Sequence, residues 1–309
     1  MTQTPVRLLV IGGNGFVGRH IVSHALGHGW QVTSLNLSQR HQGSENSTAV
    51  RCVSADITDI SALSEVLKNT SYEYVVNCGG YIDHTLYLQG GRRILDIHLQ
   101  GVLNLVEILD RNVLRTFVNL GSSDEYGNTL APQIETQREE PISPYSLGKV
   151  AATHFLQMLY RTENFPAVTL RPFLIYGPEQ DNRRFLPQII LGCLKGRSFP
   201  VSSGDQLRDF CYVDDTVAAV FAALSNRMAQ GQVVNVGSGR PVSIRQMIET
   251  VRHLIGGGEP QFGEVTYRPG ENMELYADIT KAKVLLGWAP KVNLETGLNK
   301  TIQWIRGLT

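Results

Sequence analysis

A glycine-rich turn between an apolar run and a helical pattern constrains this sequence more than any other feature. The run at 6–11, VRLLVI, has the unbroken hydrophobicity of a strand buried on both faces. The next residues read GGNGFVG, in which Gly12, Gly15 and Gly18 recur at intervals of three. In a strand–turn–helix unit such glycines allow a tight turn, close approach to a pyrophosphate and close helix–strand packing. The pattern therefore predicts that a dinucleotide binds here.

Apolar runs then alternate with amphipathic segments along more than half of the chain. We predict strands at 6–13, 31–38, 50–56, 72–80, 115–124 and 165–178, and helices at 16–29, 59–69, 91–112 and 144–164. This alternation predicts a Rossmann-type, doubly wound parallel α/β sheet. Beyond residue 178 the segments become shorter, with glycine and proline between them. We expect an NAD(P)-binding domain at 1–178, with elements returning near 212–237, and a smaller α/β substrate-binding lobe at 179–309.

Composition narrows the range of partners. The 28 basic residues balance 28 acidic ones, which does not indicate a basic face for nucleic acid. No apolar run reaches the ~18 residues that a membrane span needs, and the N-terminus lacks the features of a signal peptide. The four cysteines are widely spaced, which predicts a reduced, cytoplasmic protein without a disulfide framework or a metal site.

The end of the second predicted strand bears on which dinucleotide binds. An acid at this place accepts the ribose hydroxyls of NAD, whereas a neutral residue near an arginine suits the 2′-phosphate of NADP. Asn36 stands here, and Ser38 and Arg40 follow it. Because a carboxylate would repel the phosphate and Arg40 could bind it, we expect NADP(H), with NAD(H) as the alternative.

Two further stretches carry candidate catalytic groups. PYSLGK puts Tyr145 and Lys149 four residues apart at the start of a predicted helix, so both face the same way. A neighbouring ammonium lowers the pKa of a phenol, which can then act as an acid or base nearer neutral pH. Ser123, within LGSSDEYGN, follows the fifth predicted strand at the sheet edge where such folds bind ligands. The sequence therefore predicts an active site of Ser123, Tyr145 and Lys149.

Together these motifs resemble those of extended short-chain dehydrogenases/reductases of the nucleotide-sugar epimerase/dehydratase kind. The likeness spans nearly the whole chain and includes RPFLIYGP, RDFCYVDD, NVGSG, YRPGEN and DITKAKVLLGW. It implies that Ser123 is the hydroxyl partner, Tyr145 the acid/base and Lys149 the residue that holds the nicotinamide ribose. The residues implied for cofactor binding are Gly12, Asn14, Gly15, Phe16, Val17, Gly18, Asn36, Ser38, Arg40, Asp56, Ile57, Gly79, Tyr145 and Lys149.

The resemblance also implies a nucleoside-diphosphate sugar as the substrate. Arg208 and Arg268 would meet its diphosphate or ribose, because a guanidinium fork suits phosphate oxygens. The alternative for Arg208 is a structural pair with Asp209 or Asp214, and for Arg268 the cap of a turn. Further substrate contacts are expected from the loop that begins the sugar-binding region and from the loop after Ser123, through Arg183, Asp124 and Glu125. The alternative for Glu125 is that it fixes the backbone of its loop.

Three chemistries fit such a scaffold. Epimerases oxidise C4 and reduce it from the other face, dehydratases eliminate water with an Asp–Glu pair, and reductases consume NADPH on a 4-keto sugar. GSSDEYG is one residue shorter than the dehydratase pattern and resembles the SSEEYG of 4-keto-6-deoxy sugar reductases. We therefore expect NADPH-dependent reduction of a 4-keto-6-deoxy sugar nucleotide. C4 epimerisation with retained NAD is the alternative, ahead of 4,6-dehydration and of a non-enzymatic NADP-binding redox sensor.

The sequence departs from the family pattern at several places. His98 replaces a frequent asparagine and is interpreted as a structural histidine, and Leu174 also replaces an asparagine. Gly79 and Gly80 replace an alanine pair, which lets the chain pass close to the cofactor. Beyond them, the mouth of the pocket would be lined by Tyr81, Asp83 and His84. The resemblance also implies a homodimer built on the helix at 91–112 and the Tyr145 helix. The first of these helices is apolar around much of its circumference, which suits burial on two sides in a dimer but equally burial in the core of a monomer.

Overall fold

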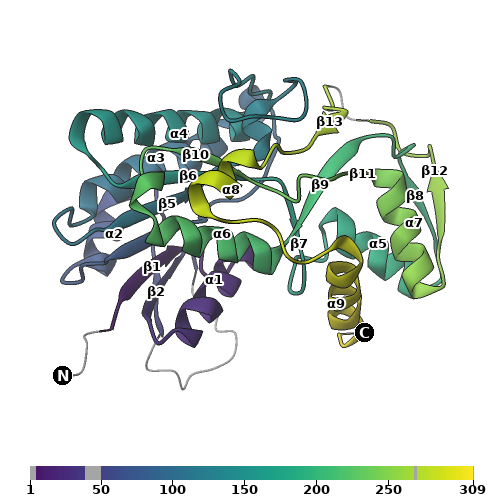
Figure 1. The fold of residues 1–309 in the computed structure, drawn as a ribbon, viewed down its shortest axis with the longest axis horizontal. Coiled ribbons are helices and arrows are strands. Elements are labelled where there is room, and N and C mark those ends of the chain that lie inside the picture. The colour runs from purple at the N-terminus through teal and green to yellow at the C-terminus, as the bar shows by residue number, and fades with distance from the viewer. Residues whose placement is uncertain (1–4, 39–49, 268–269, 309) are drawn as a thin grey trace. The chain divides into compact units, whose positions relative to one another are not determined.

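The computed structural model describes residues 5–38, 50–267 and 270–308 and divides the chain into two compact units (Figure 1). The first unit comprises Met1–Gly127, Glu139–Arg171 and Val217–Val234, and the second comprises Asn128–Arg138, Pro172–Thr216 and Asn235–Thr309. Compared with the predicted boundary at 178, residues 128–138 and 172–178 join the second unit.

The first unit is built on a seven-stranded sheet with the order β10-β6-β5-β4-β1-β2-β3. The pairs from β3 through to β6 are parallel. This confirms the predicted doubly wound fold, to which β10 adds a seventh strand. The central strands are buried on both faces, as their apolar runs indicated. The strands are β1 Arg7–Ile11, β2 Gln31–Asn36, β3 Val50–Ser54, β4 Tyr74–Asn77, β5 Thr116–Leu120, β6 Ala167–Pro172 and β10 Val233–Val236.

Helices cover both faces of this sheet (Figure 1). On one face the His24 ring of α1 lies 4.3 Å from the Phe221 ring of α6, centre to centre. On the other face α3 packs between α2 and α4. The helices are α1 Phe16–Gly27, α2 Ile60–Leu67, α3 Arg92–Ile108, α4 Pro144–Glu163 and α6 Val213–Ser225, with 3-10 turns at η1 Tyr87–Gln89, η2 Ser123–Tyr126 and η3 Arg227–Ala229.

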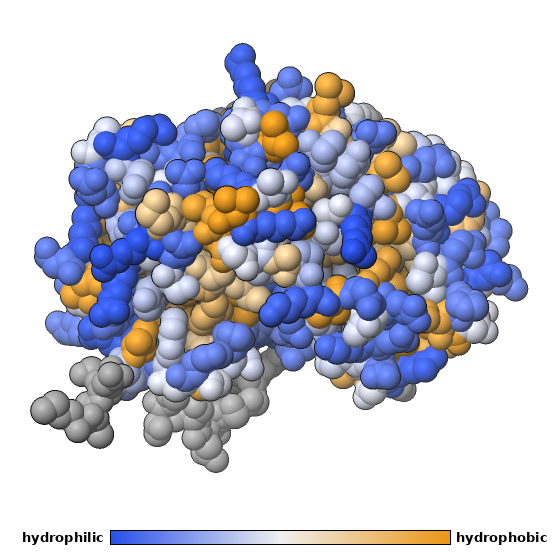
Figure 2. All heavy atoms as spheres, viewed as in Figure 1, coloured by the Kyte–Doolittle hydropathy of each residue, from blue (hydrophilic) through white to orange (hydrophobic). Residues whose placement is uncertain are grey.

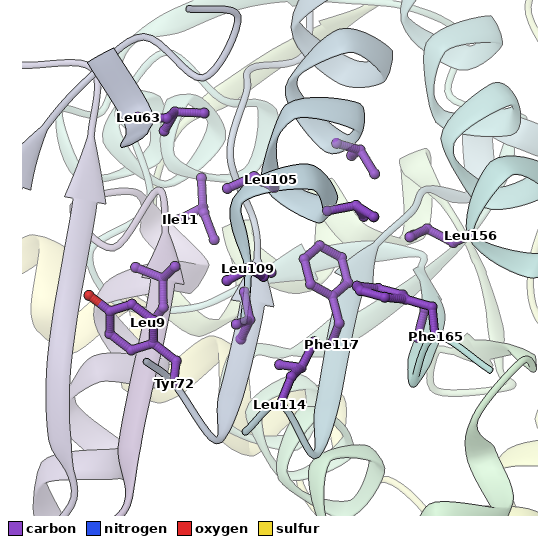
Figure 3. Packing of buried hydrophobic residues seen from close by; sticks show 14 of the residues in the cluster. Leu9, Ile11, Leu63, Tyr72, Leu105, Leu109, Leu114, Phe117, Leu156 and Phe165 are labelled. Atoms are coloured by element: carbon purple, nitrogen blue, oxygen red, sulfur yellow. The ribbon is translucent and has the colours of Figure 1, made fainter. Parts of the chain in front are cut away.

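The main core of the first unit lies between the sheet and α2, α3 and α4. Leu9, Leu105 and Phe117 from β1, α3 and β5 are fully buried in it (Figure 3). Phe117 and Phe165 bring their ring centres to 5.7 Å. A core packed this closely holds the ends of β4 and β5 rigidly against α3 and α4, where the candidate site lies.

The start of α4 is set by its sequence. Ser143 caps the helix, since its hydroxyl accepts a hydrogen bond from the Ser146 backbone N–H at 3.1 Å, and Ser146 bonds back to Ser143. Pro144 follows at the first helical position, which suits its fixed φ. Tyr145 and Lys149 therefore occupy successive turns at the start of α4, and both are buried.

The second unit has smaller sheets. Strand β9 pairs with β11, β13 and β7, and β12 pairs with β8, while α5 packs against α7 and α9. Buried Asp209 of β9 ties this unit together, because its carboxylate accepts hydrogen bonds from Ser238, Gly239 and Ala277. The elements are β7 Leu174–Tyr176, α5 Phe185–Leu194, β8 Ser198–Val201, β9 Leu207–Tyr212, β11 Pro241–Ser243, α7 Ile244–Ile255, β12 Glu259–Phe262, β13 Glu274–Leu275, α8 Thr280–Leu286 and α9 Leu294–Arg306.

The face of the molecule in Figure 2 is mostly hydrophilic, with its hydrophobic residues in small groups. None of the helices in the described part of the chain has the length and hydrophobicity that crossing a membrane requires.

Candidate active site

The glycine loop between β1 and α1 has the tight geometry that the sequence predicts. Gly12 has a φ of +76°, and a Cβ there would lie 2.8 Å from the Cys78 carbonyl oxygen. A Cβ on Gly18 would overlap the Gly12 carbonyl. Gly15 directly precedes α1, and no side chain of the described residues caps this end of the helix. The first amides of α1 are therefore available to an anion such as a pyrophosphate, so the loop fits a dinucleotide.

Asn36, at the end of β2, is bonded to this loop. Its Oδ1 accepts a hydrogen bond from the Asn14 backbone N–H at 2.8 Å, and its Nδ2 donates to the Ser34 hydroxyl at 3.0 Å. This bracing of the loop was not predicted from the sequence. Ser38 is exposed just beyond β2, whereas Arg40 lies outside the described residues.

The predicted cofactor residues after β3 also have partners. The Asp56 carboxylate accepts a hydrogen bond from the Thr58 backbone N–H at 2.9 Å and lies 3.3 Å from the Arg93 guanidinium. The Thr58 bonds, with a smaller contribution from Arg93, lower the pKa of Asp56 despite its partial burial. The Ile57 carbonyl accepts from the Asn104 amide at 2.9 Å. Phe16 and Val17 lie in the first turn of α1.

The two glycines after β4 make room for side chains. A Cβ on Gly79 would lie 2.6 Å from Cγ2 of Ile11, and one on Gly80 would overlap the His98 imidazole. The absence of a Cβ at these two positions therefore leaves room for Ile11 and His98. Any contact between the Gly79 backbone and a cofactor stays a prediction.

Tyr145 and Lys149 lie together at the carboxyl end of β5. The Lys149 ammonium donates a hydrogen bond to the Leu120 carbonyl at 2.7 Å and lies 5.9 Å from the centre of the Tyr145 ring. Turn η2, which carries Ser123, packs against α4. The structure thus groups the elements that bear the three predicted catalytic residues.

Two neighbouring serines differ in what their hydroxyls do. Ser122 caps η2, since its Oγ accepts from the Asp124 backbone N–H at 3.1 Å. The Ser123 hydroxyl makes no hydrogen bond to any of the described residues, although the residue is only 4% exposed. Ser123 is therefore the hydroxyl that remains uncommitted.

Burial controls the charge of Lys149. Removal from water lowers the pKa of Lys149 to about 8, against the opposing attraction of the Glu125 charge. At neutral pH the Lys149 amine is therefore still mostly protonated, and its positive charge can favour the ionised form of a nearby phenol.

We expect Lys149 to make stability depend on pH. Between about pH 8 and the usual lysine value of 10.5, the unfolded chain holds a proton that the folded chain has lost. The free energy of unfolding should therefore rise with pH across this window, by up to about 3 kcal/mol more in the wild-type protein than in Lys149→Met. Urea unfolding of both proteins at pH 7.5 and pH 10 measures this difference. If the two proteins differ in stability by the same amount at both pH values, folding does not lower the pKa of Lys149.

Two histidine rings stand beside Tyr145. The His98 ring of α3 is 4.9 Å from the Tyr145 ring, centre to centre, and nearly perpendicular to it at 85°. The His84 ring is 5.9 Å away at 79°, and its Nε2 lies 3.9 Å from the Asp124 carboxylate. The sequence placed His84 near the pocket but did not predict that both rings meet Tyr145.

The contacts of Glu125 favour the alternative that it fixes its loop. This residue is fully buried, and its carboxylate accepts hydrogen bonds from the Ser122 backbone N–H, the Thr153 hydroxyl and Arg171 Nε, each at 2.9 Å. With its oxygens occupied within the first unit, Glu125 holds the loop instead of contacting a substrate. Asp124 beside it is partly exposed and stays a candidate.

Arg171 completes this buried network and was not predicted as part of it. Its Nη2 lies 2.8 Å from Glu125 and 2.5 Å from Glu139, and its guanidinium lies 4.7 Å from the centre of the Tyr126 ring. The available signal was an arginine inside an otherwise apolar strand, VTLRPF, since a buried charge requires a partner.

Comparison with known proteins identifies the family of the chain. Residues 8–237 match the model of the NAD dependent epimerase/dehydratase family. The chain belongs to this family. A provisionally named UDP-glucose 4-epimerase of Methanocaldococcus jannaschii is 30% identical, over 97% of this chain and 98% of its own. dTDP-glucose 4,6-dehydratase 1 of Escherichia coli is 25% identical, over 97% and 92%. The solved UDP-glucose 4-epimerase of Thermotoga maritima, with UDP-glucose, has a TM-score of 0.90 and 26% identity, over 98% and 99%.

Two of the three arginines predicted to bind the substrate form ion pairs within the second unit. Arg208 is buried and pairs with Glu271, and Arg208 Nη1 donates to the Leu207 carbonyl. Arg183 is exposed and pairs with Asp181. Arg268 lies outside the described residues. Roles for these three arginines in substrate binding stay predictions.

Proposed function

We propose that this protein acts at C4 of a nucleoside-diphosphate sugar, and that it reduces a 4-keto-6-deoxy sugar with NADPH. Ser123 donates a hydrogen bond to the C4 oxygen, and Tyr145 delivers the proton that this oxygen takes up. The Lys149 ammonium stabilises the phenolate that remains on Tyr145. The bound reduced nicotinamide supplies the hydride. The UDP-glucose in the Thermotoga maritima structure supports a nucleotide sugar as the substrate class.

The uncharged residue at the end of β2, Asn36, is the main support for net reduction with NADPH. An amide, not a carboxylate, stands at Asn36 and braces the glycine loop through the Asn14 N–H. A neutral amide does not repel the 2′-phosphate of NADP, which Ser38 and Arg40 would bind in this proposal. NADPH suits a reductase, because the oxidised cofactor must leave after each turnover. NAD(H) remains the alternative, as in the family description.

The buried network disfavours dehydration. A 4,6-dehydratase uses an Asp–Glu pair to move protons, but the Glu125 carboxylate is committed to Arg171 and Thr153. Only Asp124 of this pair retains some exposure. The shortened GSSDEYG loop therefore supports a reductase more than a dehydratase.

C4 epimerisation with retained NAD is the second candidate. The names of the Methanocaldococcus jannaschii and Thermotoga maritima relatives favour it. The two chemistries differ in their products, since an epimerase interconverts two hexoses without net consumption of cofactor. Incubation with UDP-glucose, and separately with a 4-keto-6-deoxy dTDP-sugar and NADPH, followed by NMR of the products, distinguishes them. A UDP-galactose product with no reduction of the keto sugar would overturn the reductase proposal.

We also propose which residues bind the substrate, how the protein assembles and where it is located. Arg208, Arg268 and Arg183 would bind the diphosphate or sugar, with Asp124 as a further contact. A homodimer built on α3 and α4 is supported by exposed Leu147 and Met158 on α4. The described residues include four cysteines, all unpaired, which supports a cytoplasmic location.

A further inference from the structure

His98 lies where α3 packs against α4 within the candidate site. The residue is only 4% exposed, and its ring meets the Tyr145 ring edge-to-face at 4.9 Å. Aromatic pairs favour this perpendicular arrangement, which holds one ring in a defined orientation relative to the other. The proton donor that we assign to the reaction therefore rests against a buried ring from another helix.

Local glycines make the space that His98 occupies. A Cβ on Gly148, one turn after Tyr145 on α4, would lie 2.9 Å from the His98 Cβ. A Cβ on Gly80 would overlap the distal edge of the imidazole. Larger residues at either position would displace the ring or separate the helices, so the two glycines and the histidine form one packing unit.

A hydrogen bond fixes the orientation of the imidazole within this unit. Its Nε2 lies 3.1 Å from the Tyr81 carbonyl oxygen. Since a carbonyl only accepts, Nε2 carries the proton. Burial and the nearby Lys149 charge lower the pKa of His98 to about 3, so the ring is neutral at physiological pH. Because the imidazole is neutral, it adds no charge that would alter the effect of the Lys149 ammonium on the Tyr145 phenol.

We propose that His98 is a positioning residue that fixes the orientation of the Tyr145 ring for proton transfer at C4. This inference rests on the proposed function, in which Tyr145 is the proton-transfer group. His98 acts through the contact of its ring with the Tyr145 ring, and it does not itself exchange a proton with the substrate. A small displacement of the Tyr145 hydroxyl is enough to slow the reaction, because proton transfer depends steeply on the geometry of the reacting atoms.

Substitutions of His98 separate the ring from the hydrogen bond. His98→Asn removes the ring, and its amide is too short to reach the Tyr81 carbonyl as Nε2 does, whereas His98→Gln removes the ring but keeps a donor within reach. We expect kcat of either variant to fall roughly 10- to 100-fold at every pH. His98→Phe keeps the ring and should retain most of the wild-type kcat. The assay is NADPH-dependent reduction of a 4-keto-6-deoxy dTDP-sugar, or UDP-glucose epimerisation if that is the activity found. Cofactor affinity should stay near wild type, whereas Tm should fall in the Asn variant because the smaller side chain leaves space in a packed region. His98→Gln replaces the Asn variant if that variant does not fold.

His253→Asn is the matched control, since His253 is an exposed histidine at the end of α7 and should keep wild-type activity. A wild-type kcat in His98→Asn, or an equal loss in His98→Phe, would overturn the positioning role. Tyr145→Phe in the same assay separates this inference from the proposed function. If Tyr145→Phe turns over normally, the proposed function fails. If Tyr145→Phe is inactive and His98→Asn is normal, only the positioning role of His98 fails.

Discussion

Replacing Tyr145 with phenylalanine is expected to lower kcat by roughly 10²- to 10⁴-fold, the usual contribution of a positioned acid or base. The change removes one hydroxyl from a ring that is almost fully buried and leaves its contacts with His98 and Lys149 in place. Cofactor affinity and Tm should therefore stay near wild type. Steady-state turnover, a fluorescence titration with NADPH and thermal unfolding measure the three quantities. Wild-type turnover in this variant would contradict the assignment of Tyr145 as the acid/base. If the wild type and the variant both bind NADPH fully and neither is active, the redox sensor becomes the better account.

The two serines of the loop provide the comparison for this experiment. Ser123→Ala removes the hydroxyl that is uncommitted among the described residues and should lower kcat with little loss of stability. Ser122→Ala removes the cap of η2 and should lower stability by about 1 kcal/mol. If Ser122→Ala, with its fold intact, loses more turnover than Ser123→Ala, the substrate hydroxyl partner is Ser122.

The substitution Arg171→Met should destabilise the protein by about 3–5 kcal/mol, the usual cost of removing one partner from a buried ion pair. Arg171 is fully buried on β6 and lies between Glu125 and Glu139. Without it, the wholly buried Glu125 carboxylate would lose its counter-charge, and the loop that carries Ser123 would lose its main anchor. Urea unfolding at neutral pH measures the loss.

An exposed pair supplies the control for this second prediction. Arg252 and Glu249 lie on α7 with their side chains half exposed and 3.0 Å apart. Exposed pairs contribute little, so Arg252→Met should change stability by less than about 1 kcal/mol. Similar losses in the two variants would show that the Arg171 network does not stabilise the first unit more than a surface pair does.

Local patterns were sufficient to predict the part of the site that neighbouring residues build. The glycine loop follows from GGNGFVG, because its shape depends on backbone freedom at Gly12 and on close packing at Gly18. The common placement of Tyr145 and Lys149 follows from the period of a helix that Ser143 and Pro144 begin. The parallel sheet follows from buried apolar runs alternating with helices.

Contacts between distant segments could not be predicted in this way. Glu125 looked like a loop acid near a substrate, but its partner Arg171 lies 46 positions further along the chain. The departures at Gly80 and His98 looked independent, although Gly80 leaves the space that the His98 imidazole fills. Nor did composition reveal that 128–138 joins the second unit, since that assignment depends on pairing such as that between Gln133 and Ala277.

Identifying the cofactor that the purified protein carries and the one that it consumes tests the central claim most directly. Bound nucleotides would be released and identified by mass, and the stripped protein supplied with NADPH or NADH and a 4-keto-6-deoxy dTDP-sugar. We expect little retained cofactor and one NADPH oxidised for each keto sugar reduced, with NADH used less well. Tightly bound NAD that co-purifies with the protein, together with no net consumption of NADPH, would contradict the reductase and make C4 epimerisation the better account.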